Sequence, residues 1–132
     1  MIDVVCATRL TEQQFWNQTA LGFSLRRLSR DPRLTPRIHS ENTKGLPAVY
    51  NSHLNGKGSE HLVFVHDDVW IEDIFFADRV LGGLRAFDGI GLAGNRRRVP
   101  NQPAWSFIDK AMTWDSRENL SGCVAHGRQP FG

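Results

Sequence analysis

The sequence has few cysteines, a nearly balanced charge and no long apolar run. Its two cysteines, Cys6 and Cys123, stand far apart in the chain, so we interpret both as free thiols in a reducing compartment. The formal net charge is only +2, which predicts no overall field that would attract nucleic acid or a membrane surface. No apolar stretch approaches the roughly 20 residues that a membrane-spanning helix needs.

The N-terminus also lacks the basic start and the apolar core of a signal peptide. We therefore expect a cytoplasmic protein that does not span a membrane. The sequence shows no internal repeat and no low-complexity segment. With 132 residues, 40% of them hydrophobic, it is long enough for one domain with a real core and too short for two ordinary domains. The prediction is one domain over residues 1–132.

The clearest chemical signal follows an apolar run at residues 62–65. The run is rich in β-branched and aromatic residues, which is typical of a strand buried on both faces of a parallel sheet. It ends at His66, Asp67 and Asp68. Ligands of open α/β sheets bind at the carboxyl ends of the strands, and adjacent carboxylates repel each other unless a hard cation such as Mg²⁺ or Mn²⁺ is bound. The acidic pair therefore predicts a divalent cation that can hold a diphosphate.

Strand-like and helix-like segments alternate along the rest of the chain. We predict strands at residues 2–8, 37–39, 89–93 and 120–126, and helices at residues 11–30, 47–54 and 71–87. Thr11 and Gln14 have the spacing of a capping box, Pro47 suits the first turn of a helix, and Pro32 and Pro36 bracket a turn. This alternation predicts an α/β domain with three layers, α/β/α, around a mostly parallel sheet.

Four segments also match a known family. They are Ala7-Thr8-Arg9 after the first strand, Glu41-Asn42 after the second, residues 45–51, and residues 63–69. Together they resemble the nucleotide-binding half of the family 2 glycosyltransferases, which have the GT-A fold. The short glycosyltransferase-like subgroup with the motif F-V-H-x-D-V is the most similar. The sequence departs from the general family at Tyr50, where Arg is usual, and at His66, where the first Asp of the D-x-D motif stands.

The resemblance implies both a fold and a site. Members of this family carry an acceptor half after the D-x-D strand, and only part of it fits before Gly132, so we expect a GT-A domain truncated at its C-terminal side. The implied activity is transfer of a sugar from a nucleotide-diphospho-sugar to an acceptor hydroxyl. The residues implied for donor binding are Thr8, Arg9, Glu41, Asn51 and Asp67. Asp68 and Asp67 would hold Mn²⁺ or Mg²⁺.

Two parts of such an enzyme are not identified. The acceptor is unknown, and no carboxylate after the motif has the context of a general base, although Asp109, Asp115 and Glu118 are available. Residues 96–98, three consecutive arginines, can contact phosphate or can form a solvated loop.

Other interpretations stay open. Asp67 and Asp68 can serve as a turn and helix cap, and Arg9 can be a solvated loop residue. The whole chain can be a non-catalytic binding module for a nucleotide or sugar nucleotide that acts through a protein partner. A receiver-like phosphoryl-transfer domain is disfavoured because the end of its first strand should carry a carboxylate, and Ala7-Thr8-Arg9 has none. Since a truncated sheet leaves strand edges uncovered, we also expect a homo-oligomer.

Overall fold

A computed structural model describes residues 1–56 and 58–122 of the chain. The chain divides into two compact units, residues 1–83 and residues 84–132. The sequence predicted one domain over the whole chain. In the structure, the α/β architecture belongs to the first unit. Within the described residues no helix is both long and apolar enough to cross a membrane.

The first unit is built on a small parallel sheet. Its three strands are β1 (Ile2–Ala7), β2 (Leu34–His39) and β3 (His61–Phe64), in the spatial order β2-β1-β3. Both pairings are parallel, with Ile2 opposite Leu34 on one side and opposite His61 on the other. The predicted α/β class and parallel strands are therefore confirmed.

The central and most deeply buried strand is β1. The apolar run at residues 62–65, which the sequence predicted to be buried on both faces, belongs to β3 and its end. Residues Ile2–Cys6 are buried, whereas every residue of β3 is only partly buried. The reason is position, because β1 has a strand on each side and helices over both faces, and β3 lies at an edge of the described sheet. The prediction that residues 62–65 are buried on both faces is thus wrong.

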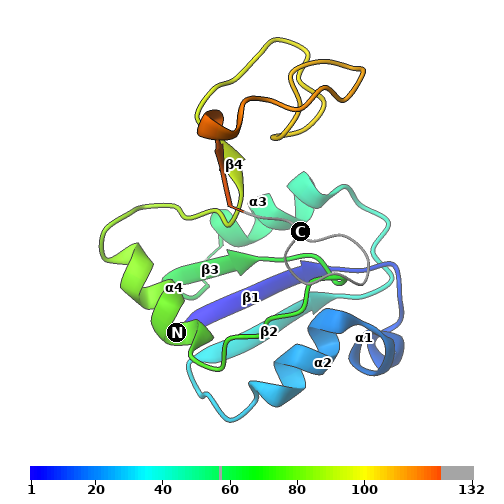
Figure 1. The fold of residues 1–132 in the computed structure, drawn as a ribbon. Helices are drawn as coiled ribbons and strands as arrows, with labels where there is room; N and C mark the ends of the chain where they lie inside the picture. The colour runs from blue at the N-terminus through cyan, green and yellow to red at the C-terminus, as the bar shows by residue number, and fades with distance from the viewer. Residues whose placement is uncertain (57, 123–132) are drawn as a thin grey trace. The chain divides into compact units, whose positions relative to one another are not determined.

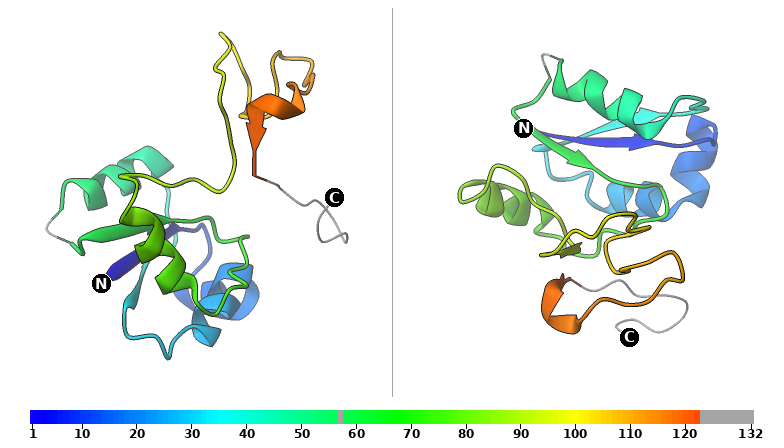
Figure 2. Two further views of the ribbon diagram at one scale, coloured as in Figure 1. Left: turned by 60° about the vertical axis from the view of Figure 1, so that its left-hand side comes forward. Right: turned by 90° about the horizontal axis from the view of Figure 1, so that it is seen from above.

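Helices cover both faces of the sheet (Figures 1 and 2). The helices α1 (Glu12–Gln18), α2 (Ala20–Arg27) and α4 (Phe76–Leu84) lie on one face, and α3 (Leu46–Leu54) lies on the other. Side chains alternate along β1, so Ile2, Val4 and Cys6 enter the core beneath the first group of helices. The other members of that core are Phe15, Leu21, Leu25, Leu28, Ile71 and Ala77.

The predicted helix over residues 11–30 is two helices that meet at Thr19. The capping box is present, since Thr11 Oγ1 accepts from the Gln14 N–H at 3.2 Å and Gln14 Oε1 accepts from the Thr11 N–H at 3.0 Å. Thr19 has an extended backbone and caps α2, because its Oγ1 accepts from the Gly22 N–H at 2.9 Å. A Cβ at Gly22 would lie 2.2 Å from the Phe15 carbonyl oxygen, so this close approach requires glycine.

Two other element bounds differ from the prediction. The strand β2 begins at Leu34 and includes Pro36, which the sequence placed in a turn. In a parallel pair with this register, the nitrogen of Pro36 faces away from β1, so no sheet hydrogen bond is lost. Helix α4 begins at Phe76 rather than at residue 71. Residues 71–75 are irregular because Arg27 donates to the carbonyl oxygens of Ile71 at 2.8 Å and Glu72 at 2.5 Å.

The second unit has little regular structure. It contains β4 (Gly94–Asn95), a short 3-10 helix (Arg117–Asn119) and β5 (Leu120–Ser121), with β4 and β5 antiparallel. The predicted strand at residues 89–93 is wrong, since those residues form no strand and most of them are exposed. The predicted strand at residues 120–126 is present at Leu120–Ser121, Gly122 is already outside the strand, and residues 123–126 lie outside the described residues.

Candidate functional site

The candidate site lies at the carboxyl ends of the three parallel strands. There the chain places Thr8 and Arg9 after β1, Glu41 after β2, and Asp67 and Asp68 after β3. In the order β2-β1-β3 the connection after β1 leads to β2 on one side, and the connection after β2 crosses β1 to reach β3 on the other side, so the topological switch point lies between β1 and β3. Open α/β sheets bind ligands at this place.

A direct hydrogen bond joins the ends of β1 and β3. Thr8 Oγ1 donates to Asp67 Oδ2 at 2.6 Å, and the same hydroxyl accepts from the Leu10 N–H at 3.2 Å. Thr8 is buried and Asp67 is half-buried. The Asp67 carbonyl oxygen also accepts from the Leu21 N–H at 3.1 Å, which ties the acidic segment to the first turn of α2. Asp67 is therefore held in one orientation with one carboxylate oxygen engaged.

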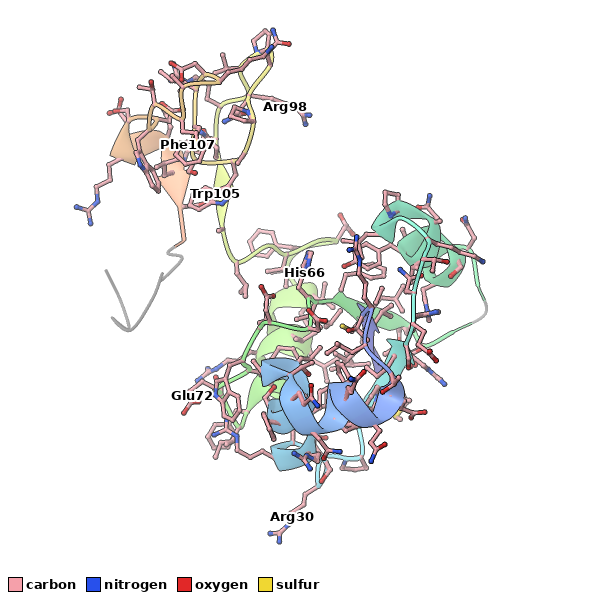
Figure 3. All side chains as sticks on the ribbon, turned by 90° about the vertical axis from the view of Figure 1, so that its right-hand side faces the viewer. Arg30, His66, Glu72, Arg98, Trp105 and Phe107 are labelled. Carbon is pink, nitrogen blue, oxygen red and sulfur yellow. The ribbon has the colours of Figure 1, made fainter. Side chains whose placement is uncertain are left out.

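Asp68 differs from Asp67 in being exposed, as is His66 (labelled in Figure 3). Among the described residues, no group of three or more His, Cys, Asp or Glu side chains is placed to hold a metal ion. The Asp67 and Asp68 carboxylates alone would suit only a cation that takes most of its ligands from water or from a bound substrate. Mg²⁺ is commonly bound through one or two carboxylates together with waters and substrate phosphates. Two carboxylates would be enough for a site of that kind, and the described residues form no closed structural metal site.

Two backbone hydrogen bonds join the loop after β2 to the loop after β1. The Glu41 N–H donates to the Leu10 carbonyl oxygen and the Asn42 N–H to that of Thr8, both at 2.9 Å. Glu41 has a left-handed backbone with φ 48°, a conformation uncommon for residues other than glycine. These bonds join the loop that carries Glu41 to the loop of residues 8–10. The Glu41 and Arg9 side chains are both exposed.

A shallow depression of about 300 Å³ opens beside this loop. It is lined by residues 39–44 and by Ala48, Val49 and Ser52 of α3, with mostly polar atoms. Asn51, which the resemblance placed at the donor, is exposed on α3 and does not line the depression. Tyr50, which replaces the usual Arg, stacks on Phe64 of β3 with ring centroids 4.4 Å apart.

Cys6 lies buried in the core at the end of β1 and is a free thiol. Burial, and then the negative charges of Asp67 and Asp68, raise its pKa to about 12. The thiol is therefore protonated and unreactive at neutral pH. Cys123 lies outside the described residues.

Two of the three candidate general bases in the second unit, Asp115 and Asp109, are held in structural bonds, whereas Glu118 is exposed. Asp115 is buried and accepts from Asn95, Arg97, Asn119 and the Ser116 N–H. The bonds from Asn95 and then Arg97 hold the pKa of Asp115 well below its usual range. The Thr113 N–H also lowers the pKa of Asp109. Neither carboxylate is suited to take a proton at neutral pH.

The three consecutive arginines do not act alike. All three are exposed, but Arg97 pairs with Asp115, with an Nη2–Oδ1 distance of 2.5 Å, whereas Arg96 and Arg98 form no ion pair with a described residue. Figure 3 shows Arg98 extending from its loop, and Trp105 and Phe107 within the same unit. Arg97 is therefore engaged in the fold of this unit, and only its two neighbours are available to a phosphate.

Two polar pairs in the first unit were not predicted. His39 at the end of β2 and His53 on α3 have their Nε2 atoms 2.8 Å apart. Asp3, the second residue of β1, is buried and accepts from Ser59 Oγ at 2.7 Å. Both pairs join residues far apart in the sequence, so local patterns carry no signal for them.

No protein-family model matches this chain, and neither a curated protein nor a solved structure is significantly similar to it.

Proposed function

We propose that the chain is a glycosyltransferase-like protein whose residues 1–83 bind a nucleotide-diphospho-sugar at the carboxyl edge of the sheet. The observation that supports this most is the Thr8–Asp67 hydrogen bond of 2.6 Å. It places the acidic pair at the topological switch point between β1 and β3, beside the loop that carries Glu41. The four segments that resemble the GT-A fold supply the same residues.

Each residue would have a distinct role in binding the donor. Asp68 would hold Mn²⁺ or Mg²⁺ together with Oδ1 of Asp67, which has no hydrogen-bond partner within residues 1–56 and 58–122. The bound cation would offset the charge of the leaving diphosphate. Thr8 keeps the Asp67 carboxylate oriented toward that position. Arg9 and Glu41 would contact the base and ribose from the joined loops. Asn51, on the exposed side of α3, would contact the donor from outside the depression.

Calorimetric titration of UDP, GDP and CDP into the full chain, with and without Mn²⁺, tests the donor site. We expect binding that depends on Mn²⁺ and weakens at least tenfold in Asp68→Ala, because a charge-assisted ligand of the cation is lost. Glu60→Ala is the matched control, since Glu60 is an exposed acid in the same unit and outside the site. Equal binding by Asp68→Ala and wild type, or binding by no nucleotide in a folded protein, would refute the proposal.

A second candidate function is a binding module without transferase activity. The state of Asp115 and Asp109 favours it, because both carboxylates are held ionised by hydrogen bonds and are poor proton acceptors. Incubating the protein with UDP-sugars and Mn²⁺ separates the two candidates. Binding without released UDP, even with a panel of acceptors, would support the module, and turnover would support the enzyme.

A further inference from the structure

The contact between His39 and His53 is a direct imidazole–imidazole hydrogen bond. Their Nε2 atoms are 2.8 Å apart, the ring planes are perpendicular at 90°, and the ring centroids are 5.1 Å apart. This centroid separation is about the Nε2–Nε2 distance plus the two ring radii, so the rings meet head-on. The two nitrogens point at each other and not at a common third point. The geometry is therefore that of an N–H···N bond, and a shared metal ion is not implied.

Such a bond tolerates only certain protonation states. In the neutral pair, one Nε2–H donates to the lone pair of the other Nε2. A first added proton can enter at Nδ1 of the donor ring and leaves the bond intact. A second added proton must occupy the accepting Nε2, which sets two N–H groups and two positive charges against each other. The pair can therefore carry one positive charge but not two.

Helix α3 depends on few other contacts. Of its nine residues only Val49 is buried, and Tyr50 adds the stacking contact with Phe64. His53 lies one turn later and provides the contact to the end of β2. Since His39 also lines the depression beside α3, this contact connects the helix to the loop of residues 40–44.

The surrounding charges do not favour a doubly protonated pair. Lys44 and Glu41 line the same depression as His39, and Arg9 follows Thr8, whose N–H donates to the His39 carbonyl oxygen at 3.0 Å. Helix α3 itself carries no acidic side chain. Burial lowers the pKa of His39, and the charges of His53 and Lys44 lower it further.

We propose that the His39–His53 contact is a pH-sensitive latch, which holds α3 against the end of β2 at neutral pH and releases it in acid. Because the folded protein disfavours protonation, the stabilisation is fully present above the ordinary histidine pKa of about 6.5 and is lost as the pH falls below it. Release of α3 from β2 would move Ala48, Val49 and Ser52, which form one wall of the depression. Its effect on α3 stands alone, whereas any effect on nucleotide affinity rests on the proposed function.

Amide hydrogen exchange of α3 in the full chain tests the latch. After correction for intrinsic rates, the protection of residues 50–55 should fall about three- to tenfold between pH 7.5 and pH 5, as expected for loss of one hydrogen bond. His53→Gln should remove this pH dependence, because an amide can still bond to His39 but cannot become charged. His61→Gln is the matched control, because it removes a histidine of β3 outside the contact, and it should leave the pH dependence unchanged.

Protection that is independent of pH in the wild type, or pH dependence that persists in His53→Gln, would overturn the latch. If His53→Gln fails to fold, the reciprocal His39→Gln and the ¹⁵N–¹⁵N scalar coupling across the wild-type bond at pH 7.5 decide the question. An absent coupling would refute the bond itself. Nucleotide titration at both pH values completes the test. No binding at either pH would refute the proposed function, and the exchange result would still decide the latch.

Discussion

At the scale of single residues, Asp3 shows how a charge is accommodated in the core. It is 1% exposed in the central strand, and its carboxylate receives bonds from Ser59 and an ion pair from Arg37, with Nε 3.3 Å from Oδ2. Burial opposes ionisation and would raise the pKa of Asp3, but the bonds from Ser59 and then Arg37 outweigh it, so the pKa is lowered. Asp3 therefore stabilises the fold in its ionised form.

We expect Asp3→Asn to lower the free energy of unfolding at pH 7 by about 1–3 kcal/mol, because buried bonds are left unmade. Since the folded pKa lies below the unfolded value of about 3.9, the stabilisation is present above that pH and is lost as the pH falls through the folded pKa. Urea denaturation followed by circular dichroism should show the difference between the variant and the wild type shrinking as the pH falls below about 3.9. A difference that does not shrink in acid, or a similar loss in the exposed control Glu60→Gln, would contradict this role.

At the scale of elements, Thr19 separates two helices that the sequence predicted as one. Its hydroxyl accepts from the Gly22 N–H and donates to the Phe15 carbonyl oxygen at 2.8 Å, so it ends α1 and begins α2. Thr19 is buried, and water cannot replace these bonds. The break directs α2 over the core and places the Leu21 N–H against the Asp67 carbonyl oxygen.

Thr19→Ala should lower the free energy of unfolding by about 1–2 kcal/mol, the upper part of the range for a lost N-cap. Thr19→Ser is the matched control, since it keeps the hydroxyl and should be less destabilised. Both can be measured by urea denaturation at neutral pH. Equal stability of Thr19→Ala and the wild type would show that the helix break does not depend on this cap.

At the scale of the whole molecule, local signals predicted several elements but not the order of the strands. The capping box at Thr11 and the helix with Pro47 in its first turn are present because each depends on neighbouring residues, and the parallel pairing follows from the alternation of strands and helices. The central position of β1 could not be predicted, since the order of strands is a property of packing.

The candidate site was predicted only in part for the same reason. Thr8, Glu41 and Asp67 come together because parallel strands share one carboxyl edge, which the alternation of elements already indicated. The Thr8–Asp67 bond and the His39–His53 contact depend on side-chain directions that no local pattern encodes. Asp115 was considered as a base, and only its burial among Asn95, Arg97 and Asn119 shows its structural role.

The two edge strands of the sheet, β2 and β3, differ in how readily a second copy of the chain could pair with them. Pro36 in β2 faces outward without an N–H, a device that protects edge strands from pairing, whereas β3 has no strand beside its outer edge among the described residues. A homo-oligomer stays a prediction, and β3 is the strand at which a second copy would pair.

The central claim is that the carboxyl edge of this sheet binds a nucleotide through a divalent cation. Paramagnetic broadening of amide signals by Mn²⁺ in the presence of UDP, GDP or CDP tests it most directly. The account predicts that the signals of residues 8–10, 40–42 and 66–69 broaden first, only when nucleotide and Mn²⁺ are both present, and not in Asp68→Ala. Broadening that begins elsewhere, or that is the same without nucleotide, would contradict it.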